Sequence, residues 1–180
     1  MGTALVTGAT SGIGEEFCWQ LAAAGHDLVL VARRDDTLRA LADSLANVAG
    51  VRAEVIAADL STDSGCARVA ARLDVGGPAD REKPDLAPVD LLVNNAGFGL
   101  GTDFLDNSLD NEISGLNVMV RAVMTLAHHA GISMRSRGRG AILNVGSVAS
   151  RTGAGTYSAH KAWVVAFTEG LAAELKGSGI

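Results

Sequence analysis

Short runs rich in β-branched residues alternate with longer stretches rich in alanine and leucine along all 180 residues. The short runs are continuously apolar and predict buried strands at 3–7, 27–32, 51–57, 89–94 and 140–145. The longer stretches predict helices at 12–24, 36–46, 61–73, 110–135 and 156–176. Ser61 is the expected N-cap of the third helix. This alternation predicts a parallel sheet with helices on both faces.

The handedness of the crossovers then restricts the topology. Right-handed strand–helix–strand connections predict the strand order 3-2-1-4-5, with a ligand crevice at the switch between the first and fourth strands. We therefore expect one α/β domain over residues 1–180, with a doubly wound, Rossmann-type parallel sheet. The stretch 76–88 holds all three prolines and predicts a loop, too short to link two domains.

A glycine-rich turn, Thr7-Gly8-Ala9-Thr10-Ser11-Gly12-Ile13-Gly14, joins the first strand to the first helix. Its glycines permit a tight turn and let backbone amides approach a pyrophosphate at the helix N-terminus. A turn that only packs the helix on the strand has the same pattern. Its position at the first strand–helix junction favours a dinucleotide site.

The end of the second strand indicates which dinucleotide binds. A carboxylate there suits a free ribose 2′-hydroxyl, whereas an arginine suits a 2′-phosphate. The chain has Ala32-Arg33-Arg34 at this point, and Asp35 and Asp36 fit the start of the next helix better than a ribose contact. The sequence predicts NADP(H) in preference to NAD(H), with Arg33 as the phosphate ligand.

Tyr157 and Lys161 stand four residues apart in a predicted helix and share one of its faces. An ammonium group beside a phenol favours the phenolate, so such a tyrosine can exchange a proton with a substrate oxygen. The pair alone is a weak signal, because Tyr-x-x-x-Lys occurs by chance on many helices.

Six features together resemble the short-chain dehydrogenase/reductase family, in its classical branch, over essentially all 180 residues. They follow the order and nearly the spacing of the family: the glycine turn, Asp59, Asn94-Asn95-Ala96-Gly97, Asn117, Ser147 and Tyr157-x-x-x-Lys161. The resemblance implies an oxidoreductase that interconverts a carbonyl and a secondary alcohol by hydride transfer with NADP(H).

The resemblance also implies catalytic roles. Tyr157 matches the general acid/base, and Lys161 matches the lysine that binds the nicotinamide ribose and favours the phenolate. Ser147 matches the serine that donates to the substrate oxygen, and Ser150 is a weak rival for this role. Asn117 matches the asparagine that holds a water in a proton relay.

Further matches imply contacts with the cofactor. Asp59 matches the residue that binds the adenine amino group, although an ordinary aspartate at a helix entry is the alternative. Asn95, Ala96 and Gly97 resemble the segment that closes the fourth strand against the adenine ribose. The remaining matches lie in the turn: Gly8, Ser11, Gly12, Ile13 and Gly14.

The chain departs from the family after the last predicted helix. The family continues with a sixth strand, substrate-covering helices and a seventh strand, which have no counterpart in residues 1–180. We therefore expect a sheet that lacks the last strands of the family, with its fifth strand either uncovered or covered by a partner. The alternative function is a catalytically impaired dinucleotide-binding fragment of such an enzyme.

Composition excludes some classes of partner. A net charge of −5 and a pI near 5.3 argue against nucleic acid, and no apolar run approaches the ~18 residues of a membrane span. Cys18 and Cys66 are far apart and predict buried or idle thiols in a reducing cytoplasm, and no signal peptide precedes the first strand. The adjacent His128-His129 point apart, which argues against a metal site.

Apolar residues near the predicted site could line a substrate pocket or belong to the core. Four of them hint at a substrate pocket, although core packing explains each at least as well: Phe98, Leu100, Val148 and Trp163. The resemblance implies a homodimer through the two last long helices. Four residues there are candidates for the interface, or equally for contact with the chain's own sheet: Met119, Val123, Trp163 and Phe167.

Overall fold

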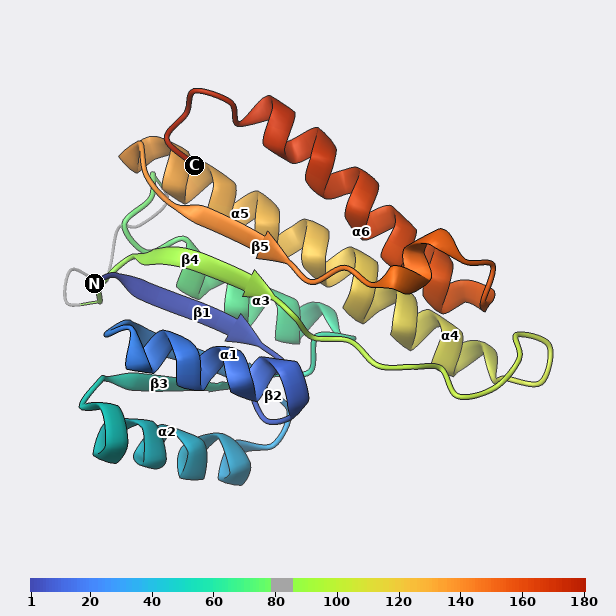
Figure 1. The fold of residues 1–180 in the computed structure, drawn as a ribbon, viewed down its shortest axis with the longest axis horizontal. Helices are drawn as coiled ribbons and strands as arrows, with labels where there is room; N and C mark the ends of the chain where they lie inside the picture. Colours follow the sequence, from blue (N-terminus) through green and yellow to red (C-terminus); the bar gives the residue numbers. More distant parts are fainter. Residues whose placement is uncertain (79–85) are drawn as a thin grey trace.

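The computed structural model of the chain describes residues 1–78 and 86–180, so part of the predicted 76–88 loop lies outside the described residues. Five parallel strands form one sheet in the order β3-β2-β1-β4-β5, which confirms the predicted topology (Figure 1). The elements in chain order are β1 (Thr3–Thr7), α1 (Gly12–Ala23), β2 (Asp27–Ala32), α2 (Asp35–Ala49), β3 (Ala53–Ala57), α3 (Asp63–Leu73), β4 (Val89–Asn94), α4 (Leu109–Leu116), the π-helical turn η1 (Asn117–Arg121), α5 (Ala122–Arg137), β5 (Ala141–Asn144), the 3-10 turn η2 (Val148–Arg151) and α6 (Gly155–Glu174).

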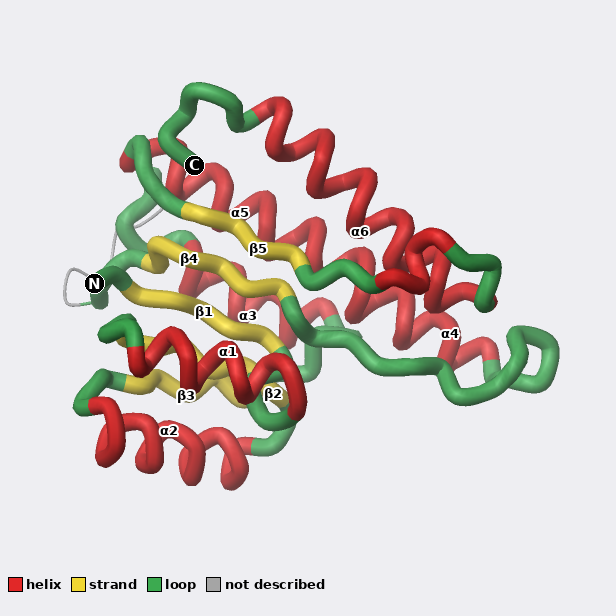
Figure 2. Tube along the Cα trace, viewed as in Figure 1, coloured by secondary structure: helices red, strands yellow, loops and turns green. Residues whose placement is uncertain are grey.

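Helices cover both faces of the sheet, so the strands are apolar on both sides. Figure 2 shows α1 and α2 on one face and α3 and α5 on the other. Ala4 and Val6 of β1 pack toward the first pair of helices, whereas Leu5 between them packs toward the second pair. Because side chains alternate along a strand, each face receives every second residue.

The central strands are joined at their carboxyl ends by the side chain of Thr7. Its Oγ1 donates to the carbonyl of Val93 (3.3 Å) and accepts from the backbone N–H groups of Asn95 and Ala96, both at 3.0 Å. The amide Nδ2 of Asn95 donates back to the carbonyl of Thr7 (3.0 Å). These bonds hold β1 and β4 together where the predicted crevice opens.

Two features of the predicted helices differ from the structure. Thr62, not Ser61, caps α3, because its Oγ1 accepts from the N–H of Gly65 (3.1 Å) while Ser61 bonds to Asp59. The single helix predicted over 110–135 is divided by η1, where the wider turn holds one more residue than an α-helical turn. The apolar pattern does not reveal the division, since the inward-facing residues stay buried on both sides of it.

Two candidates for a dimer interface face the chain's own core instead. Met119 and Val123 are buried, and Val123 directly follows Ala122 and lies one turn before Leu126, both of which belong to the core. The exposed side of α4 and α5 carries a different set of apolar residues: Leu109, Ile113, Leu116 and Met124. The apolar side chains of α4 and α5 that remain exposed to a partner therefore differ from the predicted ones.

The last strand and last helix form the margin of the fold. β5 pairs only with β4 among the described residues, and α6 runs along this edge beside η1 and α4 (Figure 1). A side-chain hydrogen bond joins β5 to α6, because Nδ2 of Asn144 on β5 donates to Oγ1 of Thr168 on α6 (3.0 Å). No helix in the described part of the chain is long and apolar enough to cross a membrane.

Candidate active site

The glycine turn brings the backbone of β1 and the first turn of α1 into close contact. A Cβ on Gly14 would lie 2.1 Å from the carbonyl oxygen of Gly8, so no larger residue fits there. Gly8 and Gly12 have φ angles of +69° and +53°, which other residues rarely adopt. Nothing lies within 4 Å of a Cβ built on Gly12, so this side of the turn is open to a ligand.

The N-terminus of α1 leaves its amides available for an anion. Its N-cap, Ser11, is exposed and makes no side-chain capping hydrogen bond. The first N–H groups of a helix have no partner within the helix, and their dipole favours a negative charge. An uncapped N-terminus beside an open glycine turn fits a pyrophosphate.

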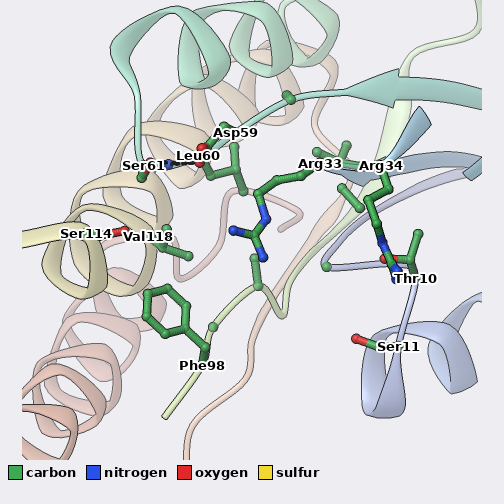
Figure 3. Close-up of a pocket in the computed structure, with 16 residues that line it drawn as sticks. Thr10, Ser11, Arg33, Arg34, Asp59, Leu60, Ser61, Phe98, Ser114 and Val118 are labelled. Carbon is green, nitrogen blue, oxygen red and sulfur yellow. Dashed lines mark hydrogen bonds between the residues drawn. The ribbon is translucent and has the colours of Figure 1, made fainter. Parts of the chain in front are cut away.

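A cavity of about 590 Å³ extends from this turn across the carboxyl ends of the strands (Figure 3). Its volume lies in the range of sites for small ligands and cofactors. The residues that line it come from the turn, the ends of β2 and β3, the segment after β4, α4 and η1: Gly8, Thr10, Ser11, Val31, Ala32, Arg33, Arg34, Ala58, Asp59, Leu60, Ser61, Ala96, Gly97, Phe98, Ser114 and Val118.

Two arginines turn into this cavity. Figure 3 shows the guanidinium of Arg33 near the centre of the cavity and that of Arg34 beside Thr10. Neither guanidinium forms a hydrogen bond or an ion pair with the described residues 1–78 and 86–180, and both residues are exposed. The sequence reasoning assigned Arg33 alone, so Arg34 and Thr10 are additions to the predicted site.

Asp59 lies in the cavity wall and not at a helix entry, because α3 begins four residues later at Asp63. Its Oδ1 accepts from the N–H (2.9 Å) and the hydroxyl (2.8 Å) of Ser61. The backbone hydrogen bond from Ser61 is the main cause that lowers the pKa of Asp59, and Arg33 lowers it further. Asp59 is therefore a charged acceptor in the cavity.

The segment after β4 divides into a structural and a cavity-lining part. Ala96 and Gly97 line the cavity, whereas the side chain of Asn95 turns to the carbonyls of Thr7 (3.0 Å) and Gly8 (3.5 Å). Asn95 thus holds the glycine turn in place through the backbone carbonyls of Thr7 and Gly8. This support extends to the helix, because a Cβ on Gly14 would lie 2.4 Å from the same Asn95 amide.

Tyr157 and Lys161 lie together on the first two turns of α6. The Nζ of Lys161 is 6.0 Å from the centre of the Tyr157 ring and donates to the carbonyl of Val145 (2.8 Å). It also lies 3.7 Å from the position of a Cβ built on Gly97, which brings the pair to the edge of the cavity segment. Lys161 is buried, and burial lowers its pKa.

Ser147 caps the short turn η2 between β5 and α6. Its Oγ accepts from the N–H of Ala149 (3.1 Å), which leaves its hydroxyl proton free to donate. Ser150 lies inside the same turn, where its N–H donates to the carbonyl of Ser147 (3.0 Å). Ser147 has the better position, since it directly follows the strand end at Asn144-Val145-Gly146.

Asn117 opens the π-helical turn between α4 and α5. Its carbonyl accepts from the N–H of Ala122, five residues on, and its half-buried side chain has no hydrogen bond to the described residues. π-helical turns often occur at functional sites. The structure therefore places Asn117 at an irregular point of the helix, with a free side-chain amide.

Of the four apolar residues considered for a substrate pocket, only Phe98 lines the cavity. Val148 is 91% exposed, and Trp163 stacks on Phe167 with ring centres 4.7 Å apart. Leu100 packs against Gly115, where a Cβ would lie 2.8 Å from its Cδ2. His129, considered for a metal, hydrogen-bonds Asp74 instead (2.8 Å).

Replacing Lys161 by Met tests the cost of burying this charge. Above the lowered pKa of Lys161 and up to the usual 10.5, the unfolded chain binds more protons than the folded chain. The free energy of unfolding of the native protein therefore rises with pH in this window, and that of Lys161→Met does not. We expect the difference in the free energy of unfolding between the native protein and the variant to change in favour of the native protein as pH rises from neutral toward 10.5. The measurement is urea unfolding at several pH values.

The matched control for this experiment is Lys176→Met, because Lys176 is exposed just after α6. Its unfolding curves should keep a constant offset from those of the native protein. If the free energy of unfolding of Lys161→Met also differed from that of the native protein by the same amount at every pH, burial would not lower the pKa of Lys161.

Comparison with known proteins places the chain in a family. Residues 2–180 match the family model described as short chain dehydrogenase. A short chain dehydrogenase of Pseudocercospora fijiensis is 33% identical over 99% of the chain and 56% of its own length. The 7beta-hydroxysteroid dehydrogenase of Collinsella aerofaciens is 30% identical over 98% of the chain and 64% of its own length.

Solved structures agree with these relatives. The bulky-bulky ketone specific alcohol dehydrogenase from Comamonas testosteroni has a TM-score of 0.91 and 34% identity, over 100% of this chain and 70% of its own. A short-chain dehydrogenase from Sphingobium yanoikuyae in complex with NADPH has a TM-score of 0.90 and 35% identity, over 99% of this chain and 67% of its own. The chain thus spans 56% to 70% of the length of these proteins. The chain belongs to the short-chain dehydrogenase family.

Proposed function

We propose that the chain carries the cofactor site and the catalytic residues of an NADP(H)-dependent oxidoreductase that interconverts a carbonyl and a secondary alcohol. The main support is the position of the Tyr157–Lys161 pair, whose ammonium group lies next to Gly97 of the cavity wall. A proton donor at the margin of a dinucleotide-sized cavity is the arrangement that carbonyl reduction requires.

The residues of the cavity fit a nicotinamide dinucleotide. The turn of Gly8, Gly12 and Gly14 with Ser11 and Ile13 would hold the pyrophosphate, since its amides are uncapped and open. Asp59 would accept from the adenine amino group, and Ala96 and Gly97 would border the ribose. The bound cofactor supplies the hydride.

The chain's own residues act on the substrate oxygen. In reduction, Tyr157 donates its proton to the developing alkoxide and Ser147 donates a hydrogen bond to the same oxygen. Lys161 would bind the nicotinamide ribose, and Asn117 would hold a water that returns the proton to Tyr157. An oxyanion donor contributes about 10²–10³-fold and a general acid about 10²–10⁴-fold.

Replacing Tyr157 by Phe removes the proton donor and keeps the ring. Turnover should fall at least about 10²-fold, and binding of NADPH should remain because the ring is retained. The measurement is NADPH oxidation with ethyl acetoacetate and acetophenone as probe ketones. Ser147→Ala should also lose activity, whereas the matched control Ser150→Ala should keep it. Near-native turnover of Tyr157→Phe would overturn the assignment.

The preference for NADP(H) over NAD(H) is supported by Arg33 and Arg34, which both point into the cavity (Figure 3). A guanidinium can form two hydrogen bonds with a phosphate. Among the similar solved structures, those from Sphingobium yanoikuyae and from a metagenomic source are described as complexes with NADPH and NADP.

A thermal-shift titration with NADPH and NADH tests this preference. NADPH at 100 times its Kd should add about 2.7 kcal/mol to the free energy of unfolding, and NADH at the same concentration should add far less. In Arg33→Ser the NADPH affinity should fall by about 10-fold or more, with NADH unchanged. Equal shifts with both cofactors would contradict the preference.

The alternative function is an impaired dinucleotide-binding fragment. It is supported by the outer edge of β5, with which no strand of the described residues pairs, and by the length of the relatives, of which the chain spans 56% and 64% in two cases. Binding of NADPH without turnover of any probe ketone would favour this alternative. The expected partner in either case is a small carbonyl or alcohol, and the free, buried Cys18 and Cys66 support a cytoplasmic location.

A dimer is proposed through the exposed apolar row of α4 and α5, namely Leu109, Ile113, Leu116 and Met124. A second copy of the chain would remove this row from water. In light scattering, the native chain should have the mass of a dimer, and Met124→Lys should shift it toward monomer. Val48→Lys, at an exposed apolar residue of α2, is the control and should leave the mass unchanged. A native monomer would contradict the proposal.

A further inference from the structure

A buried carboxylate, Glu112, connects two segments of the site. Glu112 lies in the first turn of α4 and is only 7% exposed. Its Oε1 accepts from Asn107 Nδ2 (2.6 Å), and its Oε2 accepts from the hydroxyl of Thr156 in the first turn of α6. Thr156 directly precedes Tyr157, so the carboxylate holds the turn on which the candidate acid/base stands.

The surroundings of Glu112 keep it charged without a salt bridge. No arginine or lysine of the described residues forms an ion pair with it. Its hydrogen bond from Thr156 is the main cause that lowers the pKa of Glu112, followed by that from Asn107. The carboxylate also lies at the N-termini of α4 and α6, where both helix dipoles favour a negative charge.

Thr156 and His160 form one face of α6, because they are four residues apart. This face packs on α4 at Gly115, where a Cβ would lie 3.6 Å from Cε1 of His160. His160 is buried, and its Nδ1 has no hydrogen-bond partner in the described residues. Glu112 therefore makes the directed polar contact of this interface, while His160 and Gly115 pack against each other.

The start of α6 makes few other side-chain hydrogen bonds to the described residues. Its N-cap, Ala154, offers no side-chain hydrogen bond, and residues 151–155 are exposed. The hydroxyl of Ser158 is 3.1 Å from that of Thr152, which lies in this exposed segment. An uncapped helix end frays unless tertiary contacts hold it. Among the described residues, the hydrogen bond from Thr156 to Glu112 is the one that joins this turn to another helix.

We propose that Glu112 is a positioning residue for Tyr157, which it holds in place by binding Thr156 at the start of α6. This inference rests on the proposed role of Tyr157 in proton transfer. Loss of the Glu112–Thr156 bond lets the first turn of α6 move, and Tyr157 moves with it. Lys161 is held separately through Val145, so the two members of the pair lose their alignment.

The test uses two disruptive and two conservative variants. Thr156→Val and Glu112→Leu remove the bond with little change in volume, whereas Thr156→Ser and Glu112→Gln can keep it. With NADPH and the probe ketones, the disruptive variants should lose about 10- to 100-fold in kcat, because small displacements of a reacting group have effects of this size. Their Kd for NADPH should be unchanged, and the conservative variants should stay near the native kcat.

A second readout does not depend on turnover. The chain has a single tyrosine, so ring-labelled protein gives one tyrosine signal by NMR. This signal should be sharp in the native chain and broadened in Thr156→Val and Glu112→Leu, with no further broadening in the double variant. If the native chain turns over no ketone, the proposed function fails and the tyrosine signal alone decides the positioning role.

The matched control is Ser133→Ala, which removes a buried hydroxyl bound to the charged side chain of Arg137 (2.6 Å), on α5. It should lower the melting temperature and leave both kcat and the tyrosine signal unchanged. The proposal is overturned if Thr156→Val and Glu112→Leu behave like this control and lose stability alone.

Discussion

The site depends on the hydrogen bonds that the hydroxyl of Thr7 makes. This hydroxyl satisfies one carbonyl and two N–H groups at the point where β1 and β4 separate, and so fixes the carboxyl ends of both strands. The glycine turn starts from one of these ends and the cavity wall of Ala96 and Gly97 from the other. Asn95 completes the junction, since its side chain returns to the carbonyls of the turn.

Most of the fold follows from the sequence because both faces of the sheet are buried. A strand covered on both sides must be apolar throughout, so the five short runs mark the five strands, and crossover handedness restricts their order. Details that depend on competition between neighbours do not follow. Ser61 and Thr62 both carry a hydroxyl suited to a cap, and the bond from Ser61 to Asp59 decides between them.

The site was predicted less completely, for physical reasons that differ between residues. The sequence predicts one phosphate ligand at the end of the second strand, yet β2 ends at Ala32, so strand alternation does not separate Arg33 from Arg34 and both line the cavity. Glu112 gave no signal, because its partner Thr156 is 44 residues away and the contact depends on how α4 meets α6. By contrast, spacing within one helix was sufficient to bring Tyr157 and Lys161 together.

The glycine turn contains two glycines that are irreplaceable for different reasons. At Gly14 the obstacle is volume, because the backbone oxygen of Gly8 occupies the place of any side chain. At Gly12 the obstacle is handedness alone, because its surroundings are open and only its positive φ excludes L-residues. Replacement by L-alanine is therefore opposed by a steric clash with the backbone at position 14, and by the conformational preference of the new residue alone at position 12.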